Sequence, residues 1–100
     1  MFSAVLFSSD RDAASLIEEA ARASQEVCIY NALYAFPSSY ELMRMLETFK
    51  PDIVFVEIGS NGEGSKLAQA ARVIRRDAAI IGFSRYGEEE FVEEIGRAHV

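Results

Sequence analysis

The sequence is short of the residues that build disulfides, metal centres and catalytic dyads. Among its 100 residues are one cysteine, one histidine, two prolines and no tryptophan. A single cysteine cannot form an internal disulfide, which indicates a reducing compartment. Cys28 lies in an apolar run, so we expect a buried, inert thiol. With His99 as the only histidine, neither a metal site nor a catalytic thiol has support.

Positive charge is also scarce. Ten Lys and Arg residues stand against sixteen Asp and Glu residues, and the net charge is −6. A nucleic-acid surface needs clustered basic residues, so we expect no nucleic-acid binding by this domain. No apolar run approaches the ~20 residues of a membrane span. The apolar start lacks a preceding basic region and turns acidic at Asp10, which indicates a strand rather than a signal peptide. We expect a cytoplasmic protein without a membrane span.

Half of the residues are hydrophobic, and they alternate between two patterns. Short apolar runs predict strands at residues 4–7, 26–32, 52–58 and 78–84. Apolar residues at helical spacing predict helices within 10–24, 36–50, 66–77 and 85–100. This order predicts an α/β fold, in which a parallel, doubly wound sheet is covered by helices on both faces in three layers.

In such a sheet, ligands bind beyond the carboxyl ends of the strands. The first strand ends at Ser8, Ser9 and Asp10, the third at Glu57 and the fourth at Ser84. These residues are therefore the candidate site. Asp10 has an alternative role, because an aspartate at a helix start accepts backbone N–H groups as a cap.

The stretch YELMRMLETFKPDIVFVEI (40–58) resembles the response-regulator receiver domain, a CheY-like, flavodoxin-like phosphoacceptor module. That family has an amphipathic helix, then Lys-Pro-Asp, then an apolar strand that ends in the phosphorylated Asp. The resemblance places Glu57 at the phosphoacceptor position and Ser84 at the switch hydroxyl that ends the fourth strand. It covers nearly all of residues 1–100, which we treat as one receiver-like domain.

The departures from the family pattern concern its chemistry. Ser8 and Ser9 stand where receiver domains carry the acidic pair that holds Mg²⁺, with Asp10 directly after them. Mg²⁺ prefers carboxylate oxygens, so hydroxyls replace the pair poorly and Mg²⁺ binding is doubtful. No other cofactor is expected. Glu57 is one methylene longer than Asp, and misplacing a reacting group by ~1 Å can cost ~100-fold in rate. We expect an atypical pseudo-receiver that is not conventionally phosphorylated.

Three interpretations of Glu57 stay open. It is a residue that drifted after the chemistry was lost, a fixed charge that holds one signalling state, or a working phosphoacceptor. The resemblance implies signalling in a two-component phosphorelay through contacts with a protein partner or an output domain, and no enzymatic activity. The alternative is a dimerisation or localisation module at the N-terminus of a pilus-assembly ATPase of the MinD/ParA type.

The family has a fifth strand, and this sequence stops before one. We expect the N-terminal part of a longer protein, or a homodimer that covers the open sheet edge. Two further features have simpler explanations. Arg72, Arg75 and Arg76 fit a solvated helix end, with an anionic partner as the alternative. The loop 60–65 lacks the GxxxxGK[ST] spacing of a phosphate cradle.

Overall fold

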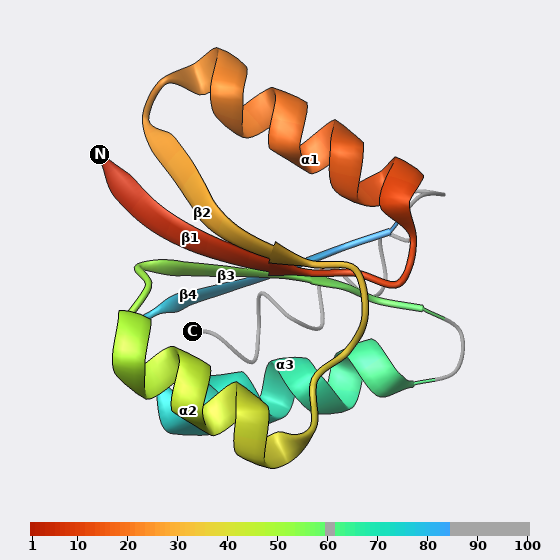
Figure 1. The fold of residues 1–100 in the computed structure, drawn as a ribbon, viewed down its shortest axis with the longest axis vertical. Helices are drawn as coiled ribbons and strands as arrows, with labels where there is room; N and C mark the ends of the chain where they lie inside the picture. The colour runs from red at the N-terminus through yellow and green to blue at the C-terminus, as the bar shows by residue number, and fades with distance from the viewer. Residues whose placement is uncertain (60–61, 85–100) are drawn as a thin grey trace.

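The computed structural model describes residues 1–59 and 62–84, and these residues form four strands and three helices (Figure 1). The elements are β1 (Phe2–Phe7), α1 (Arg11–Ser24), β2 (Val27–Leu33), α2 (Ser39–Phe49), β3 (Ile53–Glu57), α3 (Glu63–Ile74) and β4 (Ala79–Phe83). The predicted alternation of strands and helices is confirmed. The helix predicted within 85–100 lies outside the described residues.

All strand pairs are parallel, and the strand order is β2-β1-β3-β4. β1 lies inside the sheet between β2 and β3, and β2 is an edge strand. Its register with β1 shifts from Ala4↔Ile29 to Val5↔Asn31, so Tyr30 is an extra residue in β2. Such a β-bulge bends the strand locally. The predicted parallel α/β sheet is confirmed.

The core has two parts, one on each face of the sheet. Along β1 the side chains alternate, so that Val5 and Phe7 enter one cluster and Leu6 enters the other. The larger cluster joins the sheet to α2 and α3, through residues such as Leu46 of α2. The smaller one joins the sheet to α1 through Ala13 and neighbouring residues. Figure 1 shows α1 on one face and both α2 and α3 on the other, which confirms the three layers.

Side chains cap the starts of α1 and α2, and the cap at Asp10 was predicted. The Asp10 side chain accepts hydrogen bonds from the N–H groups of Asp12 (3.0 Å) and Ala13 (3.2 Å) at the start of α1. Ser38 and Glu41 form a capping box at the start of α2, with 3.2 Å from the Glu41 N–H to the Ser38 hydroxyl and 3.1 Å from the Ser38 N–H to the Glu41 carboxylate. These bonds satisfy donors that a helix start leaves unpaired.

Two sequence predictions, one about burial and one about a helix boundary, are wrong. Cys28 is exposed rather than buried, because β2 is an edge strand with only one strand neighbour. Helix α3 begins at Glu63, three residues earlier than the predicted start at 66, because Gly62 adopts a left-handed conformation (φ 81°) that starts it.

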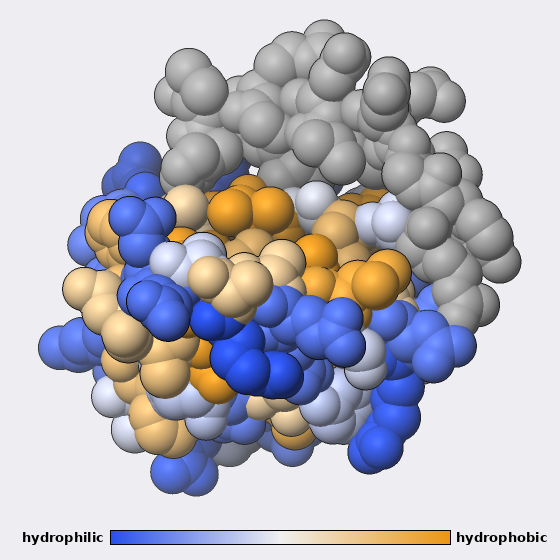
Figure 2. All heavy atoms as spheres, turned by 90° about the horizontal axis from the view of Figure 1, so that it is seen from above, coloured by the Kyte–Doolittle hydropathy of each residue, from blue (hydrophilic) through white to orange (hydrophobic). Residues whose placement is uncertain are grey.

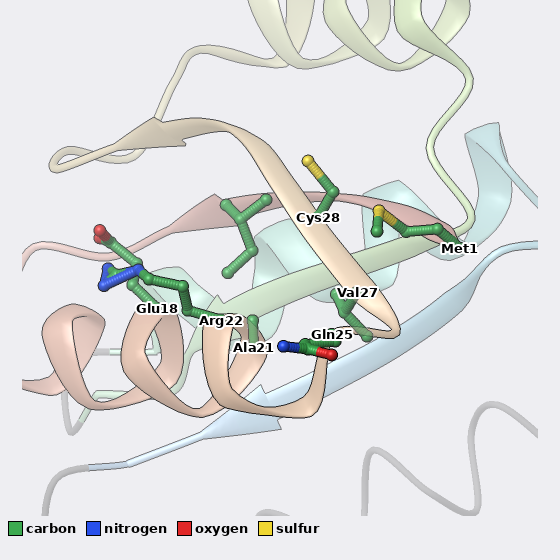
Figure 3. A pocket seen from close by; sticks show the side chains of 8 residues that line it. Met1, Glu18, Ala21, Arg22, Gln25, Val27 and Cys28 are labelled. Carbon is green, nitrogen blue, oxygen red and sulfur yellow. The ribbon is translucent and has the colours of Figure 1, made fainter.

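The exposed Cys28 borders a pocket of about 580 Å³ between the end of α1 and β2 (Figure 3). Its lining mixes apolar Met1 and Val27 with charged Glu18 and Arg22. This pocket lies at the strand starts, away from the carboxyl edge where the candidate site is expected. Among the described residues, no helix is long and apolar enough to cross a membrane.

Replacing Glu41 by glutamine should destabilise the fold at neutral pH, and this loss should shrink in acid. The hydrogen bond from the Ser38 backbone, aided by that with the Ser38 side chain, holds the pKa of Glu41 below its ordinary value of 4.5. A carboxylate with a depressed folded pKa stabilises the fold above its unfolded pKa, and the effect is lost as pH falls through the folded pKa. Urea unfolding at neutral pH and well below pH 4.5 measures it.

The matched control is Glu47→Gln, at an exposed glutamate near the other end of α2 and outside the capping box. It removes one exposed carboxylate from α2 and leaves the capping box intact. An equal pH dependence for both variants would show that the capping box does not shift the titration of Glu41.

Candidate functional site

The carboxyl ends of β1 and β3 meet because the two strands are paired, with Phe7 opposite Val56. Ser8 and Glu57 follow these residues on the two strands and are therefore neighbours. Ser8 is fully buried. Its N–H donates to the Leu33 carbonyl oxygen (3.0 Å), which fixes the end of β1 to the end of β2.

The Ser8 hydroxyl is used mainly within its own loop. It accepts a hydrogen bond from the Asp10 N–H (3.0 Å) and lies 2.8 Å from the Asp10 carbonyl oxygen, to which it donates. It also lies 3.4 Å from Glu57 Oε1. A hydroxyl has one proton to donate, so the shorter contact to Asp10 is the better bond. Ser8 therefore shapes the turn between β1 and α1.

Ser9 makes the direct contact with the candidate phosphoacceptor position. Both its backbone N–H and its hydroxyl donate to Glu57 Oε1, each at 3.0 Å. Hydrogen bonds to a carboxylate are stronger than those between neutral groups. One oxygen of Glu57 is thus held from two directions by a single residue of the neighbouring loop. An aspartate at this position is one methylene shorter, so we expect it to lose these hydrogen bonds.

The Asp10 carboxylate is directed to α1, where it caps the helix as described above. Ser84 follows β4 at the same edge of the sheet, since Glu57 is opposite Phe83 and the Ile58 N–H donates to the Phe83 carbonyl oxygen (2.7 Å). The structure thus places all five predicted residues at one edge. It brings Ser8, Ser9 and Glu57 into contact, while Asp10 belongs to the helix start.

Sequence reasoning missed Gly64, which lies in the first turn of α3. A Cβ atom at this position would collide with the carbonyl oxygen of Glu57 and would lie 3.2 Å from the Cα atom of Ile58. Only glycine therefore allows α3 to approach the end of β3 so closely. The only signal in the sequence is the glycine-rich segment that contains Gly59, Gly62 and Gly64.

A second missed group ties β2 to α1 near the site. The Tyr34 hydroxyl donates to Glu18 (2.7 Å), and the Arg11 guanidinium lies 4.3 Å from the centre of the Tyr34 ring. The bond to Glu18 is the main reason why the pKa of Tyr34 is raised. Tyr34 directly follows β2, so this contact orients the first turns of α1, which carry the Asp10 cap.

No protein-family model matches this sequence, and no curated protein matches it. Solved structures do. The signal receiver domain of a modulated diguanylate cyclase from Desulfovibrio desulfuricans G20 is 17% identical, with a TM-score of 0.68 over 97% of this chain and 75% of that one. RcsB from Salmonella enterica serovar Typhimurium is 10% identical, with a TM-score of 0.72 over 100% and 82%. A response regulator from Thermotoga maritima is 19% identical, with a TM-score of 0.69 over 98% and 78%.

The chain has the receiver-domain fold. The resemblance stated from the sequence is therefore confirmed for the CheY-like architecture, including the strand order β2-β1-β3-β4. At identities of 10% to 19%, these matches support the fold alone. What the site can do chemically has to be argued from the residues of this chain.

The described residues at this edge do not fit the Mg²⁺ ion of conventional receiver domains. Mg²⁺ needs oxygen ligands in octahedral geometry, usually with one or two carboxylates. Glu57 Oε1 already accepts two hydrogen bonds from Ser9, and Asp10 Oδ1 accepts two from the helix start. Within residues 1–59 and 62–84, no group of three Asp, Glu, His or Cys side chains is arranged to hold a metal ion.

Gly64→Ala should destabilise the fold, although alanine favours helix more than glycine does. The new methyl group would press on the backbone of Glu57 and Ile58, so the strand or helix must shift. We expect a loss of about 1–3 kcal/mol in urea unfolding. Gly62→Ala is the control, because a Cβ there meets nothing within 4 Å and costs only its positive φ. A Gly64→Ala protein as stable as wild type would contradict the close approach.

The Ser9–Glu57 contact should be measurable in a double-mutant cycle. Ser9→Ala removes the hydroxyl donor and Glu57→Ala removes the acceptor, so we expect each to cost about 1 kcal/mol and to couple by about 0.5–1 kcal/mol. Glu57→Asp keeps the charge but shortens the reach, and should resemble Glu57→Ala in urea unfolding. Ser15, exposed on α1, supplies the control, because Ser15→Ala should not couple to Glu57→Ala. If Ser9→Ala and Ser15→Ala coupled equally to Glu57→Ala, the result would contradict a direct Ser9–Glu57 contact.

Proposed function

We propose that this chain is a receiver-like signalling domain of a two-component system that acts through protein–protein contacts without conventional phosphorylation. The fold supports the first half of the proposal, since several solved receiver domains match nearly the whole chain. The hydrogen bonds from Ser9 to Glu57 support the second half, because two donors bind one oxygen of the carboxylate at the position where a receiver domain would hold its metal.

The contacts of Glu57 favour a fixed signalling state over the other two interpretations. A phosphoacceptor must present its oxygen to an incoming phosphorus atom, and Oε1 here is engaged by two donors. A drifted residue needs no partners, whereas Glu57 joins β3 to the β1–α1 loop. The negative charge and its bonds therefore hold this loop in one arrangement without a phosphoryl group.

The partner would be an output domain or a separate protein. Among the matched structures, RcsB was solved bound to a promoter in the presence of a phosphomimetic, and another is a LuxR-family response regulator from Aurantimonas sp. SI85-9A1. By analogy, we propose that this domain reports to an output rather than catalysing a reaction, and that it works in the cytoplasm.

Phosphoramidate treatment tests this proposal. After incubation with Mg²⁺ and phosphoramidate, intact-mass spectrometry should show no added phosphoryl group on the wild-type chain, while a conventional receiver domain treated in parallel gains one. Amide NMR spectra with Mg²⁺ and then beryllofluoride should show no shifts gathered at Ser8, Ser9, Glu57 and Ser84. The physical reason is the missing acidic pair, without which charge on a transferring phosphoryl group loses its main stabiliser.

A phosphoryl adduct that disappears in Glu57→Gln would overturn the proposal and restore the phosphoacceptor interpretation. A second variant serves as a positive control for the sensitivity of the NMR assay. The double variant Ser9→Asp, Glu57→Asp supplies carboxylates at the exposed position of the pair and at the acceptor position, and it should gain Mg²⁺-dependent NMR shifts. Ser8 is left unchanged, because it is fully buried.

A further inference from the structure

The pocket between the end of α1 and the start of β2 lies at the opposite edge of the sheet from Glu57 (Figure 3). Its volume of about 580 Å³ falls within the range of about 300–1,000 Å³ that is typical of small-molecule sites. All of its lining residues belong to the described part of the chain. The proposed function makes no use of this pocket.

One wall of the pocket is apolar. Val27 and Ile29 lie two residues apart on β2 and therefore point to the same side of the sheet. Ile29 packs against the core cluster that includes residues of α1, so both side chains face the α1 side. From the helix, Ala21 adds only a methyl group to the lining. This wall suits the hydrocarbon part of a ligand, which gains free energy by leaving water.

The other wall carries polar side chains of α1. Apolar and polar groups thus meet at the pocket, as hydrophobic and hydrophilic residues do elsewhere on the α1 side of the molecule (Figure 2). Figure 3 shows Arg22 and Gln25 near the end of the helix. Arg22 forms no salt bridge with a described residue, and the side-chain amide of Gln25 makes no hydrogen bond with one. The N–H donors of both side chains are therefore available to a ligand.

The lining also contains one acidic residue, Glu18, which is engaged elsewhere. Its carboxylate accepts the hydrogen bond from the Tyr34 hydroxyl (2.7 Å), and Tyr34 directly follows the end of β2. Glu18 is one helical turn before Arg22, but the two side chains form no salt bridge. The guanidinium of Arg22 is therefore a cation at the pocket whose charge no described carboxylate neutralises by contact.

The end of α1 by itself disfavours an anion, because the aligned peptide dipoles place about half a negative charge at a helix C-terminus. Arg22 lies in the last turn and carries a full positive charge. The guanidinium thus outweighs the partial charge of the helix end. A ligand at this wall is therefore expected to present an anionic head group rather than a cationic one.

A carboxylate fits these donors better than a phosphate group does. The planar guanidinium can donate two parallel hydrogen bonds to the two oxygens of a carboxylate. A phosphate monoester carries a charge of about −1.5 to −2 at neutral pH and would need more than one cation. Arg22 is the single cationic side chain in the lining of this pocket.

We propose that this pocket binds a small amphipathic carboxylate, such as a medium-chain fatty acid. The hydrocarbon part lies against Ala21, Val27 and Ile29, and the carboxylate accepts hydrogen bonds from Arg22 and Gln25. The inference goes beyond the proposed signalling function and rests on other residues, so either proposal can fail without the other.

An amide NMR titration of the whole 100-residue chain with octanoate tests the proposal. The shifts should gather at Arg22, Gln25, Val27 and Ile29. Octylammonium has the same hydrocarbon chain with a cationic head group, and it should bind about tenfold more weakly because it cannot accept the hydrogen bond from the guanidinium. Acetate has the carboxylate without the chain and should also bind about tenfold more weakly, because it buries almost no apolar surface.

Arg22→Gln should weaken octanoate binding about tenfold, since a charge-assisted hydrogen bond is lost, and Arg22→Lys should lie between this variant and wild type. Gln25→Gly removes the amide but can keep the left-handed conformation (φ 60°), so it should weaken binding without harming the fold, which circular dichroism checks. The matched control is Arg44→Gln, at an exposed arginine of α2 on the other face of the sheet. It makes the same change in net charge and should leave the affinity for octanoate unchanged.

Three outcomes would overturn the proposal of a carboxylate site. The first is an octanoate titration that leaves the amide signals of the pocket residues unshifted. The second is equal affinity for octanoate and octylammonium, because Arg22 would then not select the charge of the ligand. The third is an Arg44→Gln effect as large as that of Arg22→Gln, which would show a general effect of net charge. None of these outcomes changes the result expected from phosphoramidate.

Discussion

The carboxylate of Glu57 and the two donors of Ser9 form the contact on which the arrangement at this edge depends. The loop after β1 contains both Ser9 and the residue that caps α1, so holding Ser9 also sets where the helix begins. On its other side, the backbone of Glu57 meets α3 at Gly64. One residue therefore connects β3 with the starts of two helices on opposite faces of the sheet.

The contact between Ser9 and Glu57 joins the loop after β1 to the end of β3 through residues of the chain itself. Here two neutral donors bind one oxygen of a carboxylate, and they stabilise its negative charge without cancelling it. The longer side chain of glutamate is then an advantage, because it reaches from β3 to the backbone of the neighbouring loop.

Much of the fold could be predicted because the alternation of apolar runs and amphipathic stretches fixes a parallel α/β sheet. The cap at the start of α1 could also be predicted, because an aspartate, Asp10, stands directly before the helix. Burial was less predictable, because a pattern shows which residues could face a core but not what covers them. Cys28 on an edge strand and Leu16 on α1 both have apolar surroundings in the sequence, and both are exposed.

The position of the site could be predicted from the sequence, but its hydrogen bonds could not. The carboxyl ends of the strands had to meet, so the proximity of Ser8, Ser9 and Glu57 followed from topology. Which oxygen binds which donor depends on side-chain reach across two strands, and no spacing rule gives that. Gly64 was missed for the same reason, since its role is a close approach of a helix to a strand that only the folded chain reveals.

The extra residue at Tyr30 has a consequence for assembly. β2 is one of the two outer strands of the described sheet, and its bulge falls in the middle of its seven residues. A strand from another molecule that tried to extend the sheet there would meet a break in the spacing of backbone donors and acceptors. Bulges of this kind discourage edge-to-edge polymerisation. The molecule is thereby protected against fibre-like growth at this edge, although a seven-residue edge strand would otherwise invite it.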